Sequence, residues 1–194
     1  MSLIGRIRSR LGKLRRDEDG SIAVETLLMV PLLSWAMLST LTYFDAYRAE
    51  AISHKAGLTI ADMVSRETAT ITPDYINGTR GLLRFLTIDD NWPDLRITAF
   101  EWQESRNRYR RIWSQERGPR SALRTSDLAN MTHRLPILSD GEVAILVETW
   151  SAYSPPYSVG LSDFEMETFT VISPRFATQI CWDATPEDDA GLRC

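Results

Sequence analysis

The chain of 194 residues has few of the side chains on which enzymes most often rely. It contains two histidines and two cysteines, and the patterns G-x-S-x-G, H-E-x-x-H and the Gly-rich phosphate loop are all missing. His54 has no acidic or thiol side chain three or four positions further on, so the spacing of a catalytic dyad is lacking. The sequence therefore argues against an enzyme.

Patterns typical of metal sites are missing as well. The two cysteines do not have the spacing of a metal-binding pair. The acidic pairs Asp89–Asp90 and Asp188–Asp189 lack the alternating oxygen ligands and the glycine hinge of a calcium loop. We interpret both pairs as solvated acids and expect no metal and no cofactor.

Lysine is almost absent, because twenty of the twenty-two cationic residues are arginines. Residues 1–20 carry a net charge of +3 and the remainder of the chain carries −7, which argues against a nucleic-acid partner. One arginine-rich stretch interleaved with aromatic residues is interpreted as the solvated side of a hairpin that faces Glu101 or Glu104. Its arginines are Arg106, Arg108, Arg110 and Arg111.

Long apolar runs are absent except for one, the nineteen uncharged residues from Thr26 to Phe44. A helix of that length is about 28 Å long, close to the thickness of the hydrocarbon core of a bilayer. Six basic residues precede this segment, whereas Asp45, Arg48 and Glu50 follow it. The positive-inside rule then predicts a single span with a cytoplasmic N-terminus and a body on the other side.

Glu25 lies at the edge of this apolar segment, and three hypotheses for the N-terminus differ in how they explain it. A cleaved secretory signal fits poorly, because the acidic residues 17–19 interrupt its layout, the apolar run is too long and no A-x-A cleavage site follows. A plain signal anchor leaves Glu25 either unexplained or merely solvated outside the hydrocarbon. An ionisable residue inside a span costs about 2.5–3.5 kcal/mol at its centre, so such residues tend to be functional.

The third hypothesis takes Gly20, Ser21 and Glu25 together. A short basic leader ends at Gly20, the apolar segment begins at Ser21, and Glu25 is fifth from that point. This layout resembles the type IV prepilin class of leader. The resemblance implies that prepilin peptidase cuts between Gly20 and Ser21, that the helix is retained, and that Glu25 pairs with the N-terminal amine of a neighbouring subunit. Such a pair is physically reasonable, because each charge alone is costly in apolar surroundings.

The stretch DEDGSIAVETLLMVPLL resembles, more narrowly, the TadE-like family of tight-adherence (Tad/Flp) pilus proteins. Pro31 matches the proline of that family and predicts a kink in the span, since proline removes a helical hydrogen bond. Several downstream stretches are also similar to that family's layout, namely ADMVSRET, WSQERG, ILSDGEVAILVETWSAYSP and SPRF. Thr26 departs from the tyrosine that commonly follows the glutamate in the major pilin, which together with the large C-terminal region favours a minor component.

The resemblance implies a minor pilin or pseudopilin-like subunit that acts in pilus assembly, initiation or cell adhesion. Its expected partners are prepilin peptidase, other pilus subunits and the inner-membrane assembly platform, and its C-terminal domain is expected in the periplasm of a bacterium. Incorporation into the fibre is left open. The alternative is an unprocessed, single-pass periplasmic scaffold or binding protein.

The expected fold is α+β, with a long transmembrane helix that continues into a periplasmic domain. The divisions are a leader over 1–20, the transmembrane helix over 21–47, a helical segment over 48–92 and an antiparallel-sheet region of the same domain over 93–194. The helix is expected to continue at amphipathic spacing to about residue 67, with a candidate break near Gly57. A second short helix follows, and its expected buried face is Leu82, Leu83, Phe85 and Leu86.

Alternation of apolar and polar residues predicts the strands. Residues 95–103 and 108–115 form a hairpin, residues 142–153 a central strand and residues 163–173 a further strand. Residues 175–182 are a candidate last strand after Pro174, and a helical turn is expected from Ser126 or Asp127. Helices that precede an antiparallel sheet are typical of an α+β body.

Cys181 and Cys194 are thirteen positions apart. In an oxidising periplasm they are well placed to form a disulfide. By the chain-entropy estimate, a disulfide that closes a loop of this size stabilises the folded protein by about 3 kcal/mol. Two unpaired thiols are the alternative.

Overall fold

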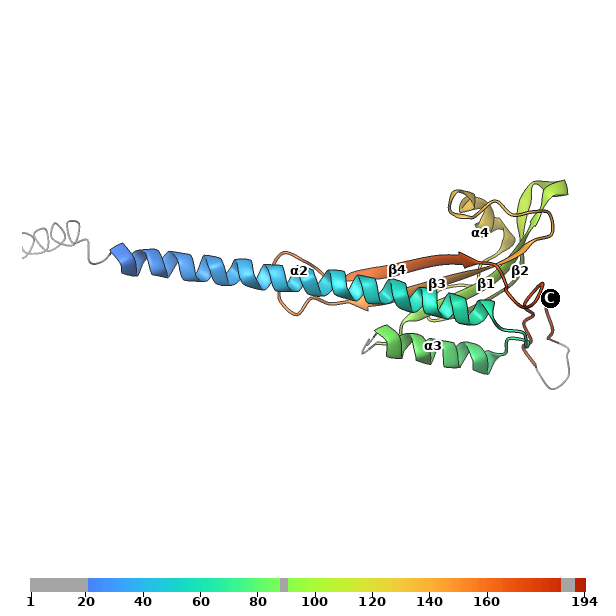
Figure 1. Ribbon diagram of the computed structural model, residues 1–194, viewed down its shortest axis with the longest axis horizontal. Helices are drawn as coiled ribbons and strands as arrows, with labels where there is room; N and C mark the ends of the chain where they lie inside the picture. Colours follow the sequence, from blue (N-terminus) through green and yellow to red (C-terminus); the bar gives the residue numbers. More distant parts are fainter. Residues whose placement is uncertain (1–20, 88–90, 186–190) are drawn as a thin grey trace, which may run out of the picture. The chain divides into compact units, whose positions relative to one another are not determined.

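A computed structural model describes residues 21–87, 91–185 and 191–194, and within them the chain has an α+β fold. It consists of a long apolar N-terminal helix, two further helices and a four-stranded antiparallel sheet (Figure 1). The helices are α2 (Ser21–Ser65), α3 (Pro73–Thr87) and α4 (Thr125–Asn130), and the strands are β1 (Asp94–Gln103), β2 (Arg108–Arg117), β3 (Val143–Tyr153) and β4 (Phe164–Ile172). Two short 3-10 helices are η2 (Glu104–Arg106) and η3 (Thr132–Arg134).

The chain divides into two compact units. One unit comprises the residues up to Asp45 together with the loop Pro155–Ser162, and the other comprises Ala46–Ser154 and Asp163–Cys194. The helix α2 contributes its first part to the former unit and its last part to the latter.

The helix α2 is continuous over 45 residues. It passes through Gly57, so the break considered there from the sequence is wrong. Pro31 lies inside it, and the expected kink stays a prediction. In its first half, four side-chain hydroxyl groups donate hydrogen bonds of 2.8–2.9 Å to the backbone carbonyl four residues earlier, which removes their need for water. These residues are Thr26, Ser39, Thr40 and Thr42.

The sheet has the strand order β2-β1-β3-β4, with every neighbouring pair antiparallel. The predicted hairpin is formed by β1 and β2, and the predicted central strand is β3. The register between β1 and β2 shifts after Ala99, where Ile112 is the extra residue on β2. Such a bulge increases local twist, which makes an edge strand a poorer template for pairing with another chain.

One face of the sheet packs against α3 and the last part of α2 (Figure 1). The buried stripe of α3 is Ile76, Thr79 and Leu83, which follow one another at intervals of three and four residues. Phe85 is 78% exposed, so its predicted place on the buried face is wrong; it lies two residues beyond Leu83 and therefore on the opposite side of the helix. Other large members of this core are Ile60, Ile71, Leu95, Ile97, Trp113, Ile145, Ile180 and Trp182.

The other face is also covered, by α4 and the connection around it (Figure 1). The predicted helical turn is α4, and its Leu128 is fully buried against Phe100 and Leu146 of the sheet. The side of β1 that faces α4 is therefore not exposed to solvent. Its Thr98 is fully buried, and the hydroxyl groups of Thr98 and Ser114 form a hydrogen bond of 2.7 Å.

Residues 175–182 do not form the candidate last strand, and that prediction is wrong. Instead, single bridges join Trp182 to Ile71 and to Arg193. The N–H of Ile71 donates to the carbonyl of Cys181 at 2.9 Å, and the indole N–H of Trp113 donates to the carbonyl of Ile180 at 2.7 Å. This segment thus covers one end of the core between the sheet and the helices α2 and α3, through single bridges rather than a regular strand ladder.

The helix α2 approaches the sheet closely at Gly57. A Cβ atom added to Gly57 would lie 2.5 Å from Cγ2 of Thr168 on β4, a distance that real side chains do not reach. Ser53, one turn earlier on α2, is also buried, as are Thr149 and Ser151 on β3. Small residues and hydroxyls therefore set the spacing between this helix and the sheet.

We expect Gly57→Ala to destabilise the protein by about 1–3 kcal/mol through overpacking, although alanine is the better helix former. Gly78→Ala is the matched control, because Gly78 lies in α3 with no atom near its added Cβ, and it should stabilise by about 0.5–1 kcal/mol. Adding Thr168→Ser to Gly57→Ala removes the clashing methyl group and should recover part of the loss. Thermal unfolding of the full chain in detergent measures all three, and a stabilising Gly57→Ala would contradict this packing.

Candidate functional site

The apolar stretch of α2 from Ile22 to Leu38 is not covered by any other described part of the chain. Every residue from Ile22 to Leu38 is exposed in the described part of the chain. Contiguous apolar surface of this extent is not left in water by soluble proteins and marks a site of contact with lipid or with other apolar chains. Its large apolar side chains are Ile22, Val24, Leu27, Leu28, Met29, Val30, Leu32, Leu33, Trp35, Met37 and Leu38. This is the one helix among the described residues that is long and apolar enough to cross a membrane.

Glu25 is the one acidic or basic side chain of α2 before Asp45. It is exposed, and no ion pair among the described residues includes it. The helix begins at Ser21, exactly one i to i+4 step before Glu25, so the two residues share a face of the helix. The carboxylate is therefore available on the same side as the residue that the sequence predicts to become the new N-terminus.

Of the two residues of the predicted processing site, the structure describes only Ser21. Gly20 and the rest of the predicted leader, residues 1–20, lie outside the described residues, as do the acidic pairs Asp89–Asp90 and Asp188–Asp189. Ser21 is the first described residue and opens α2. Pro31 follows Glu25 within the same exposed stretch.

Cys181 and Cys194 form a disulfide in the structure, with their Cα atoms 4.4 Å apart. The bonded pair flanks the bridge between Trp182 and Arg193. It fastens the end of the chain to the segment that hydrogen-bonds Ile71 and Trp113.

The arginine-rich hairpin is neutralised in part by its own strand partners, as the sequence analysis expects. Nε of Arg110 donates to Oε1 of Glu101 at 2.7 Å across the hairpin. This hydrogen bond lowers the pKa of the Glu101 carboxyl despite its partial burial, and it raises the pKa of Arg110. Arg106 and Arg108 are exposed.

A buried ion pair lies on the face of the sheet that α4 covers, and no pattern in the sequence predicts it. Nε and one terminal nitrogen of Arg96 donate to the two carboxylate oxygens of Glu148 at 2.6 and 2.7 Å. The other terminal nitrogen donates to the carbonyl of Ser121 at 2.9 Å. The side chains are 13% and 4% exposed, so desolvation is compensated by this forked geometry.

Trp150 extends this polar cluster, because two guanidinium groups lie over its ring. The central carbons of Arg120 and Arg96 are 4.1 and 5.1 Å from the ring centre. Arg120 also donates to the carboxylate of Glu165 at 2.6 Å. Contact between cations and an aromatic face is favourable when the groups are shielded from water.

Asp94 lies beside the same cluster, within 3.7 Å of both Arg80 and Arg120. Burial raises the pKa of its carboxyl, and the two arginines oppose that shift without cancelling it. Nothing in this cluster pairs a nucleophile with a base, so we interpret it as a device that orders the sheet's second face.

A cavity of about 300 Å³ lies beside the edge strand β2. Its described lining includes Arg111, Arg193, Trp113 and Trp182, and it contains no carboxylate or imidazole among those residues. Both histidines, His54 and His133, are exposed elsewhere. The described lining therefore offers no general acid or base.

Removal of one partner from the buried pair should be costly. We expect Glu148→Ala to destabilise by about 3–5 kcal/mol, because it leaves the charge of Arg96 buried without its partner. Glu167→Ala is the matched control, since Glu167 and Arg134 form a 3.0 Å pair whose side chains are each 44% exposed, and it should cost under about 1 kcal/mol. Thermal unfolding measures both. An equal loss of stability in the two variants would show that the buried pair contributes no more to stability than the exposed pair.

Comparison of the chain with protein-family models, with curated proteins and with solved structures found no match.

Proposed function

We propose that this chain is a minor pilin or pseudopilin-like subunit of a tight-adherence pilus, processed by prepilin peptidase after Gly20. The observation that carries the proposal is the apolar stretch Ile22–Leu38 of α2, in which every residue is exposed and whose single carboxylate, Glu25, lies one turn after Ser21. A plain membrane anchor has no need for a charge at this position, and such a charge is costly in lipid.

The proposed location is the inner membrane of a bacterium, with the N-terminus in the cytoplasm and the α+β body in the periplasm. The length of the exposed apolar helix supports anchoring, and the six basic residues before it support this orientation. The disulfide between Cys181 and Cys194 supports an oxidising compartment for the body, because cytosolic thiols are usually kept reduced.

Assembly is proposed to depend on Glu25. Cleavage before Ser21 creates an ammonium group at the start of α2, and in apolar surroundings that group and a carboxylate are each far more costly alone than as a pair. A neighbouring subunit that brings its amine to Glu25 satisfies both charges, and the pairing fixes how far one helix is displaced along the other. The role is thus mechanical, in initiating, priming or tipping a fibre or in adhesion, with prepilin peptidase, other pilus subunits and the assembly platform as partners.

Processing is tested by co-expression with a prepilin peptidase and intact mass spectrometry. We expect the mass of the membrane-extracted protein to fall by that of residues 1–20. Gly20→Leu should abolish the shift, whereas Gly5→Leu, which alters another glycine of the leader, should leave it intact. An unchanged mass of the parent chain would instead favour the alternative, an unprocessed single-pass scaffold or binding protein.

The role of Glu25 is tested separately from processing. Glu25→Ala should leave the cleaved mass unchanged but reduce recovery of the protein in sheared fibres by about 100-fold, the equivalent of an unpaired charge of about 3 kcal/mol in a membrane. Glu50→Gln is the matched control, because Glu50 is an exposed acid of the same helix beyond the apolar run. Normal fibre incorporation of Glu25→Ala would remove the basis of the proposed contact.

A further inference from the structure

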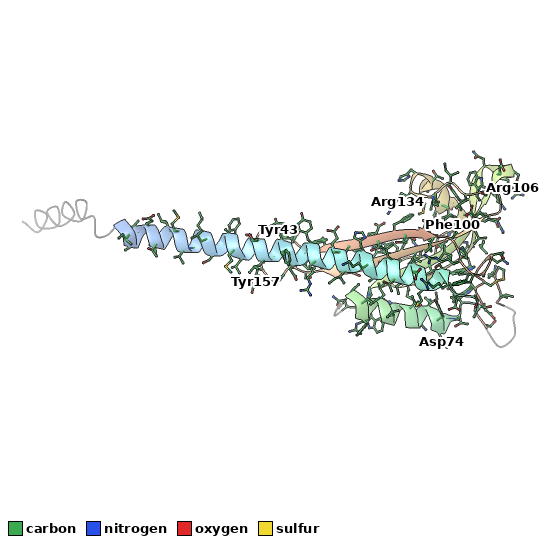
Figure 2. The ribbon with its side chains drawn as sticks, viewed as in Figure 1. Tyr43, Asp74, Phe100, Arg106, Arg134 and Tyr157 are labelled. Carbon is green, nitrogen blue, oxygen red and sulfur yellow. A yellow bond between two sulfur atoms is a disulfide. The ribbon has the colours of Figure 1, made fainter. Side chains whose placement is uncertain are left out.

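The loop between β3 and β4 belongs with the apolar part of α2 rather than with the sheet. Pro155–Ser162 groups into one compact unit with the residues up to Asp45 (Figure 1). Thr42 is fully buried although its neighbours Leu41 and Tyr43 are exposed, and within this loop Val159 is buried as well. Figure 2 shows Tyr157 and Tyr43 beside the same stretch of α2. The loop therefore covers one side of α2 near Thr42.

This stretch of α2 is the end of its apolar segment. From Glu25 to Asp45, the two charges that bound the segment, the helix rises about 30 Å, which equals the thickness of a bilayer's hydrocarbon core. Thr42 lies three residues before Asp45, about 5 Å along the axis. A loop that packs at Thr42 is therefore at the level where hydrocarbon meets the lipid headgroups.

The composition of the loop fits that level. The fourteen residues from Thr149 to Ser162 carry no charge, and the loop offers an exposed Tyr157 beside Pro156 and Leu161. Tyr43 and Tyr47 of α2 are exposed at the same end of the apolar segment. Tyrosines are enriched at the membrane–water interface, because the ring is apolar and the hydroxyl remains hydrated.

We propose that Pro155–Ser162 is a second membrane contact, which lies in the interfacial layer of the outer face of the bilayer through Tyr157 and Leu161. The partner is the lipid surface itself. Since the loop has no charged residue, its contact does not depend on anionic headgroups or on salt. This inference rests on the anchoring of α2 in a bilayer that the proposed function includes, but it does not depend on processing or on Glu25.

The test uses the full chain reconstituted into phosphatidylcholine vesicles with an environment-sensitive fluorophore on Ser158→Cys. Ser105→Cys is the matched control, since Ser105 is an exposed serine in η2. Glu101, just before η2, pairs with Val143, the first residue of β3. The loop follows the last residue of β3, and the strand between these two ends is about 30 Å long. Labelling without reductant leaves the disulfide intact, and the parent chain gives the background.

We expect the label at Ser158→Cys to emit at shorter wavelength than at Ser105→Cys and to be quenched several-fold more by lipids with a nitroxide on the headgroup. Adding Tyr157→Asp and Leu161→Asp should abolish that difference, whereas adding phosphatidylglycerol or 0.5 M salt, on the order of the concentrations that screen surface charges, should not change it.

Two results would overturn the inference while leaving the anchor in place. One is a water-like label at Ser158→Cys in protein that floats with the vesicles and resists carbonate extraction. The other is a blue-shifted label without lipid quenching, which would mean that a second copy of the chain covers the loop. Failure of the parent chain to float or resist extraction would overturn the anchoring itself, so flotation separates failure of the proposed function from failure of the loop contact.

Discussion

The structure depends on the apolar surface of α2, because the described body of the protein covers only the last part of this 45-residue helix. Over Ala46–Ser65 the helix buries Ala56, Ile60 and Val64 against the sheet and needs no other partner on that side. Over Ile22–Leu38 the same helix leaves every side chain exposed. The hydrophobic effect makes such a surface unfavourable in water, which favours contact of this stretch with lipid or with other apolar chains. In the proposed assembly, the carboxylate of Glu25 is the charged group of this stretch that requires a specific partner.

The two faces of the sheet make different kinds of contact, and one of them packs against α2. On the face toward α2 the contacts are small and close, as at Gly57 and Thr168. On the opposite face a forked Arg96–Glu148 pair and the stacked Trp150 fix the strands through directional contacts. Directional bonds specify one register, whereas small side chains permit close approach. The helix α2 itself runs without interruption from the apolar segment into the part that packs on the sheet.

Sequence patterns predicted the elements that depend on local periodicity. The alternation in β1, β2, β3 and β4 and the helical spacing around α2 located all of these elements, since period 2 and period 3.6 place side chains on one face irrespective of what covers it. What covers a face is a tertiary property. Arg96 and Glu148 are 52 residues apart, and no local pattern marks them as partners. Phe85 departs from the expected buried face for a local reason, because its offset of two residues from Leu83 turns it away from the buried stripe.

The candidate site divides in the same way. Glu25 and Pro31 were visible in the sequence because a charge and an imino acid are rare in an apolar helix, where composition alone carries the signal. The loop Pro155–Ser162 gave no such signal, because proline, serine and glycine between two strands are the ordinary composition of a turn. Its lack of charge becomes informative only because the structure groups the loop with the apolar part of α2. A neutral turn is unremarkable in water, but beside the end of an apolar helix the same neutrality is what contact with lipid requires, since charged side chains there would have to be desolvated.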